Sequence, residues 1–198
     1  MDASADDAQD LAWVRQVQRS DDRAAFACLL RRHQSGVRGL LRRLTQGDAA
    51  LADELAQECF LNAYRAMVGF RGEARIKTWL YRIAYNGFLQ QRRRLAARPV
   101  TQALDDELRD QHLSAPGQMA HEIALRLDVQ KALRVLSGPE RDAIVCCCQA
   151  DLSHAEAAEL LGWPLGTVKT HVLRAKAKLR VALAAWAPVA AADKEHAA

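Results

Sequence analysis

Aromatic residues are scarce in this sequence, where they make up 6% of 198 residues. Val and Ile are also few beside Ala, Leu and Arg. Strands are enriched in aromatic and β-branched residues, whereas Ala, Leu and Arg favour helices. Hydrophobic residues nevertheless reach 50%, enough for packed cores and too many for a disordered chain. The composition therefore predicts an all-α fold.

Features that would assign the chain to other classes of protein are also missing. No apolar run approaches the roughly 20 residues of a membrane span, and the acidic N-terminus lacks the apolar core of a signal peptide. We therefore expect a cytoplasmic protein without membrane insertion. The sequence contains no Gly-rich phosphate loop, nucleophile motif or metal-ligand spacing. We expect no catalytic residue, metal, cofactor or small-molecule substrate, so an enzyme is the least favoured class.

Five cysteines are present, but none forms a C-x-x-C pair. Three of them are adjacent, Cys146 to Cys148, and adjacent helical residues splay by about a third of a turn, which suits metal ligation poorly. Reduced thiols are the expectation for a cytoplasmic protein. A cysteine-based redox sensor stays open as an alternative function.

A helix-turn-helix is predicted between Leu152 and Leu183. Ser153 and Glu156 form an S-x-x-E capping box at the start of its first helix. Gly162 follows where that helix must stop, and Pro164 prevents its continuation. Thr167 is the predicted start of the second helix.

The second helix carries its apolar and cationic residues on different sides. Val168, Val172, Ala175, Leu179 and Leu183 recur at spacings of three and four, which indicates one buried stripe. The intervening run contains no acid, which suits a DNA major groove better than a merely solvated surface. The residues between the apolar positions, which include Thr167, Lys169, Thr170, His171, Arg174 and Lys178, are therefore candidates for DNA contact.

Three more helices are predicted in the N-terminal half, over about 7–20, from Asp21 or Asp22 to the Gly47-Asp48 turn, and over about 49–68. The third has an acidic side, which by itself indicates only solvated surface. A fourth predicted helix begins near Trp79, after a short basic loop, and places Tyr81, Tyr85 and Phe88 among arginines. Aromatic rings interleaved with arginines suit unpaired bases and phosphates, although helical aromatics also serve as core.

An acidic stretch of weak periodicity separates the two halves. We predict a helical domain over 1–98, a flexible linker over 99–117, a second helical domain over 118–187 and a disordered tail over 188–198. The second domain is expected to begin with a helix over 118–136. A second S-x-x-E box, at Ser137 and Glu140, then starts a helix that runs to about Gln149.

These segments together resemble the extracytoplasmic-function (ECF) group of the sigma-70 family, the bacterial subunits that direct RNA polymerase to promoters. The resemblance lies in DELAQECFLNAYRA at 53–66, FRGEARIKTWLYRIAYN at 70–86, LSGPERDAIV at 136–145 and LSHAEAAELLGWPLGTVKTHVLRAKAKLR at 152–180. It implies that the first domain reads and opens the −10 element, and that the helix-turn-helix reads the −35 element in promoters for transcription initiation, often in a stress response.

The resemblance also implies partners and residue roles. Core RNA polymerase would be bound through the clamp of its largest subunit and the flap of its second-largest, and an anti-sigma factor would control the chain. Residues that match the clamp-docking motif are Asp53, Glu54, Gln57, Glu58 and Phe60. Those that match the −10 segment are Arg71, Arg75, Lys77, Thr78, Trp79, Tyr81, Arg82, Tyr85, Asn86, Arg92 and Arg93. The loop from Phe70 to Thr78 would capture a flipped base.

Three positions depart from the family pattern. Gln90 replaces a frequent acid, Ile76 replaces an aromatic, and His171 replaces a common Arg, which leaves the −35 preference undetermined. A stand-alone helix-turn-helix regulator that acts without polymerase is a further alternative. It leaves the acidic side and the aromatic-basic segment unexplained.

Overall fold

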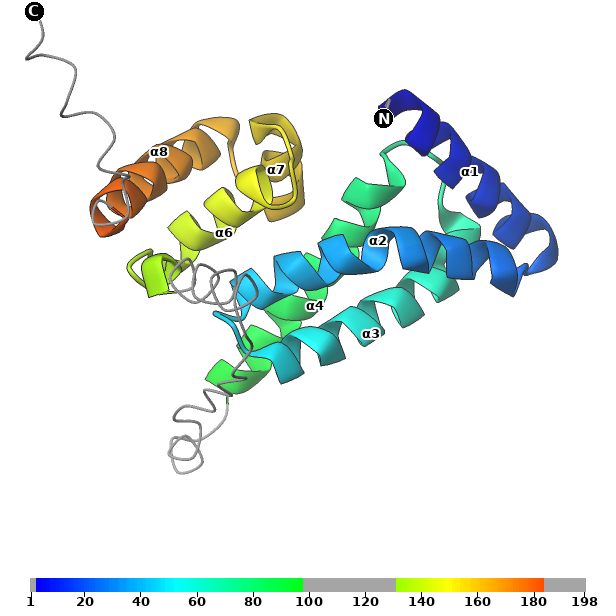
Figure 1. Cartoon of the computed structure of the whole chain (residues 1–198), viewed down its shortest axis with the longest axis horizontal. Helices are drawn as coiled ribbons and strands as arrows, with labels where there is room; N and C mark the ends of the chain where they lie inside the picture. The colour runs from blue at the N-terminus through cyan, green and yellow to red at the C-terminus, as the bar shows by residue number, and fades with distance from the viewer. Residues whose placement is uncertain (1–2, 98–130, 184–198) are drawn as a thin grey trace, which may run out of the picture.

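The computed structural model of the chain describes residues 3–97 and 131–183, which form helices and no strand. The prediction of an all-α fold is thereby confirmed. Figure 1 shows α1 to α4 grouped together; α6 packs on α2, α7 packs on α4, and α8 packs on α6 and α7. The helices are α1 (Ala3–Ser20), α2 (Arg23–Leu44), α3 (Ala49–Ala66), the 3-10 turn η1 (Met67–Gly69), α4 (Ile76–Ala96), α6 (Gly138–Cys148), α7 (His154–Leu161) and α8 (Leu165–Ala182).

Short polar side chains start several of these helices. The Asp22 carboxylate accepts hydrogen bonds from the N–H groups of Ala24 and Ala25, and the Asp48 carboxylate accepts one from Leu51. Such caps satisfy first-turn donors that have no partner within the helix. The predicted cap at Asp22 is confirmed, and Asp48 both follows the turn after α2 and starts α3.

Both predicted capping boxes are present in the C-terminal half. The Ser153 N–H donates to Glu156 at 2.9 Å, and the Glu156 N–H donates back to the Ser153 hydroxyl at 3.2 Å. The Ser137 N–H likewise donates to Glu140 at 2.9 Å. α6 and α7 therefore begin where these motifs predict.

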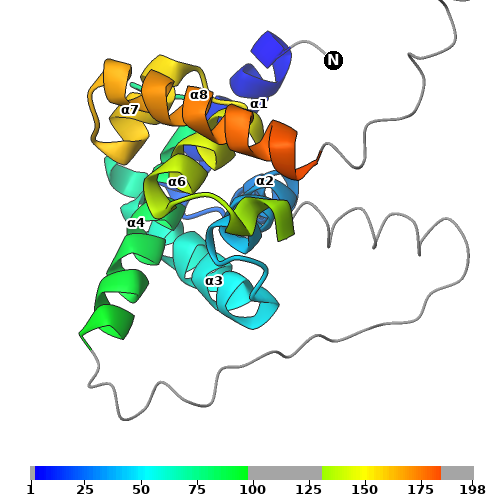
Figure 2. The same ribbon diagram turned by 90° about the vertical axis from the view of Figure 1, so that its left-hand side faces the viewer.

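One hydrophobic core runs through both halves of the molecule. Val37, Leu40 and Leu41 of α2 are fully buried, and the same cluster continues into α3, α4, α6, α7 and α8. The side view in Figure 2 shows α6 lying between α8 and the N-terminal helices. A second, smaller cluster joins α1 to the start of α4 through residues such as Val17, Met67 and Ile76.

Two glycines in α2 mark places of close approach and do not interrupt the helix. A Cβ atom on Gly36 would lie 2.6 Å from the Tyr81 hydroxyl oxygen, and one on Gly39 would lie 2.9 Å from Nε2 of Gln149. Gly36 lets α4 pack closely on α2, and Gly39 does the same for the end of α6.

Two predicted helix starts are corrected by the structure. α4 begins at Ile76, three residues before Trp79, so that Lys77 and Thr78 belong to its first turn. α8 begins at Leu165 after Pro164, two residues before the predicted Thr167, because proline at this position leads directly into a helix. Residues 131–134 of the predicted 118–136 helix are helical, while its remainder, the 99–117 linker and the 188–198 tail fall outside the described residues.

Candidate nucleic-acid interfaces

The turn between α7 and α8 has the geometry of a helix-turn-helix. α7 ends at Gly162, which adopts the left-handed conformation at φ 68°, ψ 32°. Residues other than glycine adopt this conformation at a cost, so Gly162 allows the chain to reverse within three residues. Pro164 then leads into α8, and Ala158 lies buried where the two helices cross.

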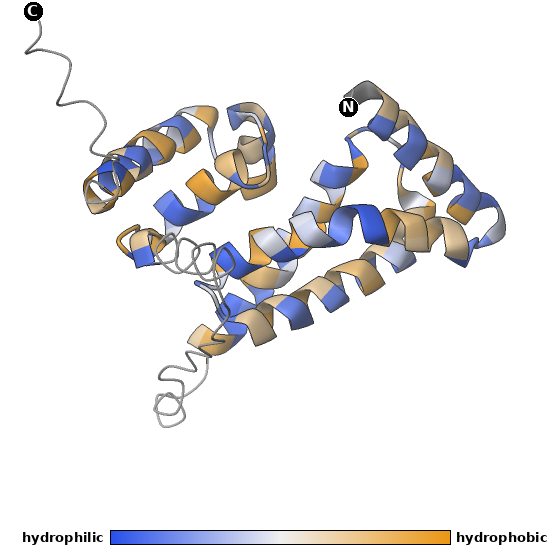
Figure 3. Cartoon of the chain, in the orientation of Figure 1, coloured by the Kyte–Doolittle hydropathy of each residue, from blue (hydrophilic) through white to orange (hydrophobic). Residues whose placement is uncertain are grey.

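α8 turns its apolar stripe inward and its cations outward. Val168, Val172 and Ala175 are buried, whereas Lys169 and Arg174 are exposed. Hydrophilic and hydrophobic residues alternate along this helix in Figure 3. The exposed side also carries Leu173, which is 71% exposed and was not predicted as a DNA contact. Viewed along the helix axis, Leu173 lies between Lys169 and Arg174, and this position could have predicted it as a DNA contact.

Three of the predicted −35 contacts make other interactions in this structure. Lys178 Nζ pairs with Glu140 at 2.7 Å, and this hydrogen bond lowers the pKa of Glu140 to about 2. The half-buried His171 ring lies 5.5 Å from the Trp163 ring. The Thr170 hydroxyl donates to the Gly166 carbonyl at 2.9 Å but keeps acceptor capacity.

α4 divides the predicted −10 contacts between two sides. Arg82, Asn86 and Arg93 are exposed along one side, with the half-buried Trp79 near their N-terminal end. Thr78, Tyr81 and Tyr85 lie on another side of the helix and are buried. The predicted contacts therefore do not form one continuous surface in this structure.

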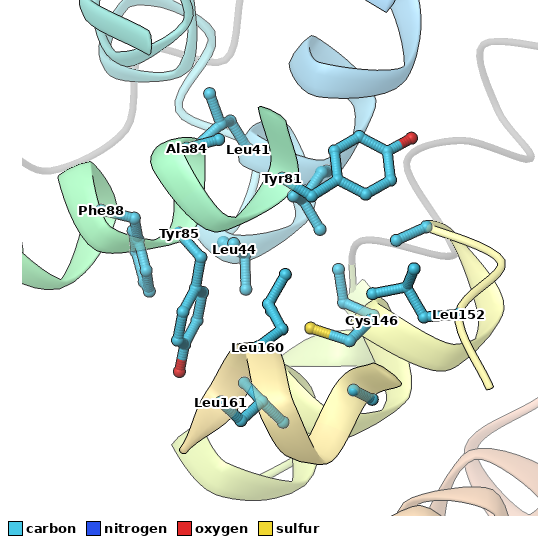
Figure 4. Close-up of a cluster of buried hydrophobic side chains, with 14 of the residues drawn as sticks. Leu41, Leu44, Tyr81, Ala84, Tyr85, Phe88, Cys146, Leu152, Leu160 and Leu161 are labelled. Atoms are coloured by element: carbon cyan, nitrogen blue, oxygen red, sulfur yellow. The ribbon is translucent and has the colours of Figure 1, made fainter. Parts of the chain in front are cut away.

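Tyr81, Tyr85 and Phe88 are buried, which favours the core role over the base-stacking role; the sequence left both open. Tyr85 is 2% exposed and Phe88 is 8% exposed, because this side of α4 faces α6 and α7. Figure 4 shows Tyr85 and Phe88 extending from α4 toward Leu160 and Leu161 of α7. Burial raises the pKa of both Tyr81 and Tyr85, to about 12 for Tyr81.

The loop before α4 is held by α1. The Gln18 side-chain amide donates to the carbonyls of Met67 and Phe70 at 3.0 and 2.8 Å. The Phe70 ring lies 5.0 Å from the Trp79 ring, which fixes the two ends of the loop against each other. Arg71 is exposed, and Arg75 lies 3.2 Å from Asp7 of α1. The loop thus presents cations on a supported backbone.

A groove of about 540 Å³ lies between α2 and α3 on the surface of the protein. Its apolar lining includes Phe60, and Leu61 on its wall is 57% exposed. Leu61 was not predicted as a contact, although its place four residues after Gln57 put it on the same side of α3. Residues along the groove are Arg23, Phe26, Leu30, Gln34, Arg38, Ala56, Gln57, Phe60, Leu61 and Tyr64.

The predicted polymerase-docking residues border this groove or lie next to it. Glu54, Gln57 and Glu58 are exposed on α3. Asp53 is partly engaged, since its carboxylate lies 3.4 Å from Arg38 and 3.8 Å from Arg42. The acidic side is therefore an exposed ridge beside an apolar groove, a combination suited to a protein partner.

The adjacent cysteines lack the surroundings of reactive thiols. Cys146 is buried, and burial raises the pKa of its thiol. Burial also raises the pKa of Cys147, which lowers the share of the nucleophilic thiolate. Cys148 is exposed. Among the residues that the structure describes, no three His, Cys, Asp or Glu side chains gather as metal ligands would.

Comparison with known proteins matches both halves of the chain to one family. The model of sigma-70 region 2 matches residues 29–98, and that of sigma-70 region 4 matches residues 126–179. The RNA polymerase sigma-H factor of Pseudomonas aeruginosa is 32% identical over 185 residues, which cover 88% of this chain and 94% of that protein. The ECF RNA polymerase sigma factor SigM of Mycobacterium tuberculosis is 35% identical, with 80% of this chain and 76% of that protein covered.

Solved structures show the same arrangement of helices. A sigma factor RpoE in complex with the anti-sigma factor NepR from Bartonella quintana superposes with a TM-score of 0.66 at 26% identity, covering 80% of this chain and 96% of that one. CnrH in complex with the cytosolic domain of CnrY superposes with a TM-score of 0.65 at 24% identity, covering 89% and 98%. The second likeness is one of fold.

The chain therefore belongs to the sigma-70 family of RNA polymerase sigma factors. Within that family it is a member of the ECF group, to which the Mycobacterium SigM factor and the sigma-E factor of Escherichia coli also belong; the latter is 32% identical, with 84% of this chain and 90% of that protein covered. Proteins of this family are not enzymes but initiation factors that bind core RNA polymerase and promoter DNA. Within the described ranges, no helix has both the length and the hydropathy of a membrane span.

Proposed function

We propose that the chain directs RNA polymerase to its promoters through three separate surfaces. The α2–α3 groove and the ridge beside it bind the clamp of the largest subunit, α4 with its preceding loop engages the −10 element, and α8 reads the −35 element. The observation that carries the proposal is the cationic side of α8, which is exposed on a helix-turn-helix whose inner side is buried.

The groove supports polymerase docking because it offers apolar area next to charge. Leu61 and Phe60 provide an apolar wall, and Glu54 and Glu58 stand on the adjoining surface. An amphipathic partner helix with a basic border fits such a surface. The region 2 match covers this part of the chain, which a stand-alone DNA-binding regulator would not need.

The −35 surface that we propose differs from the predicted set at three positions, since Leu173 is added and His171 and Lys178 are left out. Lys169, Thr170 and Arg174 point away from the core of the domain, and Leu173 adds an apolar contact suited to a thymine methyl group. Thr167 lies at the edge of this surface. Lys178 is held by Glu140, and His171 supports the turn through Trp163.

Control by an anti-sigma factor and a cytoplasmic location belong to the same proposal. The Bartonella relative was solved with an anti-sigma factor bound, and its fold matches most of this chain. Action on RNA polymerase and promoter DNA requires access to the cytoplasm. The division into domains over 1–98 and 118–187 remains a prediction.

Run-off transcription with purified core polymerase on genomic fragments tests the proposal. We expect specific transcripts with the wild-type chain and none with core alone. Asp53→Arg combined with Gln57→Ala should weaken the complex with core polymerase in a pull-down, because it alters the ridge beside the groove. Glu159→Arg, an exposed acid on α7, is the matched control. Full binding by the Asp53/Gln57 variant would contradict the assigned docking surface.

A further inference from the structure

The loop that connects η1 to α4 runs alongside α1 (Figure 1). It comprises residues 70–75, and the Phe70 N–H at its start donates to the Met67 carbonyl at 3.1 Å. Gly72 near its centre adopts φ 77°, a left-handed conformation that suits glycine. Each residue of such a loop loses conformational entropy when it is held in one shape, so the shape depends on contacts from neighbouring elements.

Gln18 of α1 supports the start of this loop. Its Nε2 amino group carries two N–H donors, and it donates to the carbonyls of Met67 and Phe70 at 3.0 and 2.8 Å. Carbonyl groups at the end of a helix have no donor within that helix. Gln18 therefore caps the end of η1 from outside and fixes the direction in which the loop leaves it.

Two more side chains of α1 support the middle and the end of the loop. Cδ2 of Leu11 lies 3.8 Å from the place that a Cβ atom on Gly72 would occupy. This separation is an ordinary van der Waals contact. An oxygen of the Asp7 carboxylate lies 3.2 Å from Nε of Arg75, the last residue before α4.

Asp7, Leu11 and Gln18 lie on one side of α1, because spacings of four and seven bring helical residues to the same side. Val14, at the intermediate position, is buried in the second core cluster. We call these four residues the loop-facing side of α1. Arg71 is exposed on the loop, so that the support from α1 leaves it accessible to DNA.

We propose that the loop-facing side of α1 holds the loop in the shape that engages an unpaired base of the −10 strand, with Gln18 as the positioning residue. The inference rests on the proposed role of the loop at −10. A loop that is already ordered in the free chain loses less conformational entropy when it binds. Gln18 therefore strengthens binding of the strand through the loop backbone, without touching DNA.

A purely structural role for α1 is the alternative, and three variants of the full chain separate the two. Gln18→Met keeps the length of the side chain and removes both donors. Gln18→Lys returns N–H donors to the same position. Gln16→Met makes the same chemical change on an exposed side of α1 and is the matched control.

The first measurement follows the loop in the absence of DNA. Arg71 is exposed in the loop, and trypsin cleaves after arginine where the backbone can adapt to the protease. We expect cleavage after Arg71, followed by mass spectrometry, to be at least about fivefold faster in Gln18→Met, which lacks two hydrogen bonds. Gln16→Met should be cleaved at the wild-type rate, and Gln18→Lys at a rate between the two.

The second measurement follows the −10 strand in holoenzyme reconstituted with core polymerase. Promoter fragments identified by run-off transcription are made with an unpaired non-template −10 segment, and each carries one abasic site. Removal of a stacked base should weaken wild-type binding by about 5- to 150-fold at the engaged position. In Gln18→Met the intact fragment should bind less tightly, and the same abasic site should cost no more than about twofold further, because the two changes disrupt one interaction.

The ratio of affinities for intact and abasic fragments identifies a positioning role. A general loss of stability lowers both affinities and leaves the ratio unchanged. Gln18→Lys should recover the larger ratio, since the ratio cancels the effect of its added charge on DNA binding. Gln16→Met should keep the wild-type ratio.

Equal rates of cleavage after Arg71 in wild type and Gln18→Met would overturn the inference, and so would equal affinity ratios. Circular dichroism and urea unfolding check that Gln18→Met is folded. If it is not, Leu11→Ala carries the test, because it removes only the contact at the middle of the loop. Leu11→Ala should speed cleavage and reduce the ratio, and wild-type values of both would overturn the inference.

This outcome is separable from that of the proposed function. If wild-type holoenzyme gives no specific transcript, or is insensitive to every abasic site, the proposed function fails at −10. Faster cleavage of Gln18→Met would then still support α1 as the element that holds the loop. If wild type is sensitive to an abasic site and Gln18→Met is equally sensitive, only the inference about Gln18 fails.

Discussion

The two helices proposed to meet promoter DNA are presented in opposite ways. α8 exposes Lys169 and Arg174 and buries only its apolar stripe, so its surface is available in the free chain. α4 exposes Arg82 and Arg93 but keeps Tyr81 and Tyr85 under the C-terminal half. The proposed −35 surface is therefore accessible to duplex DNA in the free chain, whereas part of the proposed −10 surface is not accessible to an opened strand. The comparison indicates that binding of the opened strand by α4 depends on exposure of its aromatic side chains as well as on its charge.

The largest expected effect comes from the exposed member of the pair. Arg174→Ala removes a cation from the centre of the proposed −35 surface, and a good base contact contributes about 1–3 kcal/mol, or about 5- to 150-fold. We expect a loss of that size in run-off transcription from a promoter that depends on its −35 element. Arg180→Ala, an exposed change on the same helix, is the control. Equal losses of transcription from Arg174→Ala and Arg180→Ala would mean that α8 acts only as a basic surface and does not read the −35 sequence.

A glycine-to-alanine change should lower the free energy of unfolding where α4 packs on α2 and raise it on the exposed start of α8. Gly36→Ala puts a Cβ 2.6 Å from the Tyr81 hydroxyl oxygen and should lower the free energy of unfolding by about 1–3 kcal/mol. Gly166→Ala on α8 meets nothing within 4 Å and should raise it by up to about 1 kcal/mol. Urea denaturation measures both. A neutral Gly36→Ala would mean that Tyr81 is not held against α2.

Alkaline pH should weaken the buried side of α4. The pKa of Tyr81 rises from 10.0 to about 12 on folding, so the neutral phenol is favoured in the folded chain. Its stabilisation is complete below pH 10 and is lost as the pH rises toward 12, by up to about 1.4 kcal/mol per pH unit. Urea unfolding at pH 9 and pH 11 should show the loss, and Tyr81→Phe should show less of it. An identical pH dependence in both proteins would contradict the assignment.

The smallest expected effect is at the exposed thiol. Cys148→Ser changes a side chain that borders neither proposed DNA surface, so we expect unchanged transcription with and without mild oxidant. If oxidant changed transcription by the wild-type chain and Cys148→Ser abolished that change, the result would support the alternative of a redox sensor. Cys146 is unsuitable for the test because it is buried in the common core.

Local features of the fold could be predicted from the sequence, and contacts between distant segments could not. The capping boxes, the left-handed Gly162 and the apolar stripe of α8 follow from residues a few positions apart. Periodicity grouped Tyr81 and Tyr85 on one side of α4, but the acid that meets Tyr85 lies 57 residues away. No local pattern marks Asp142 as its partner, and the same holds for Glu140 and Lys178, which are 38 residues apart.

The attachment of α1 has a practical consequence. The region 2 match starts at residue 29, yet Gln18 holds the backbone at Met67 and Phe70, and Val14 and Val17 complete the second core cluster. A fragment trimmed to the matched boundary would leave Met67 and Ile76 uncovered. It would also remove the support that Gln18 gives to the loop before α4, which we propose engages the −10 element. Deletion of the residues before 29 should impair opening of the −10 element more than recognition of the −35 element, although every residue assigned to DNA would still be present.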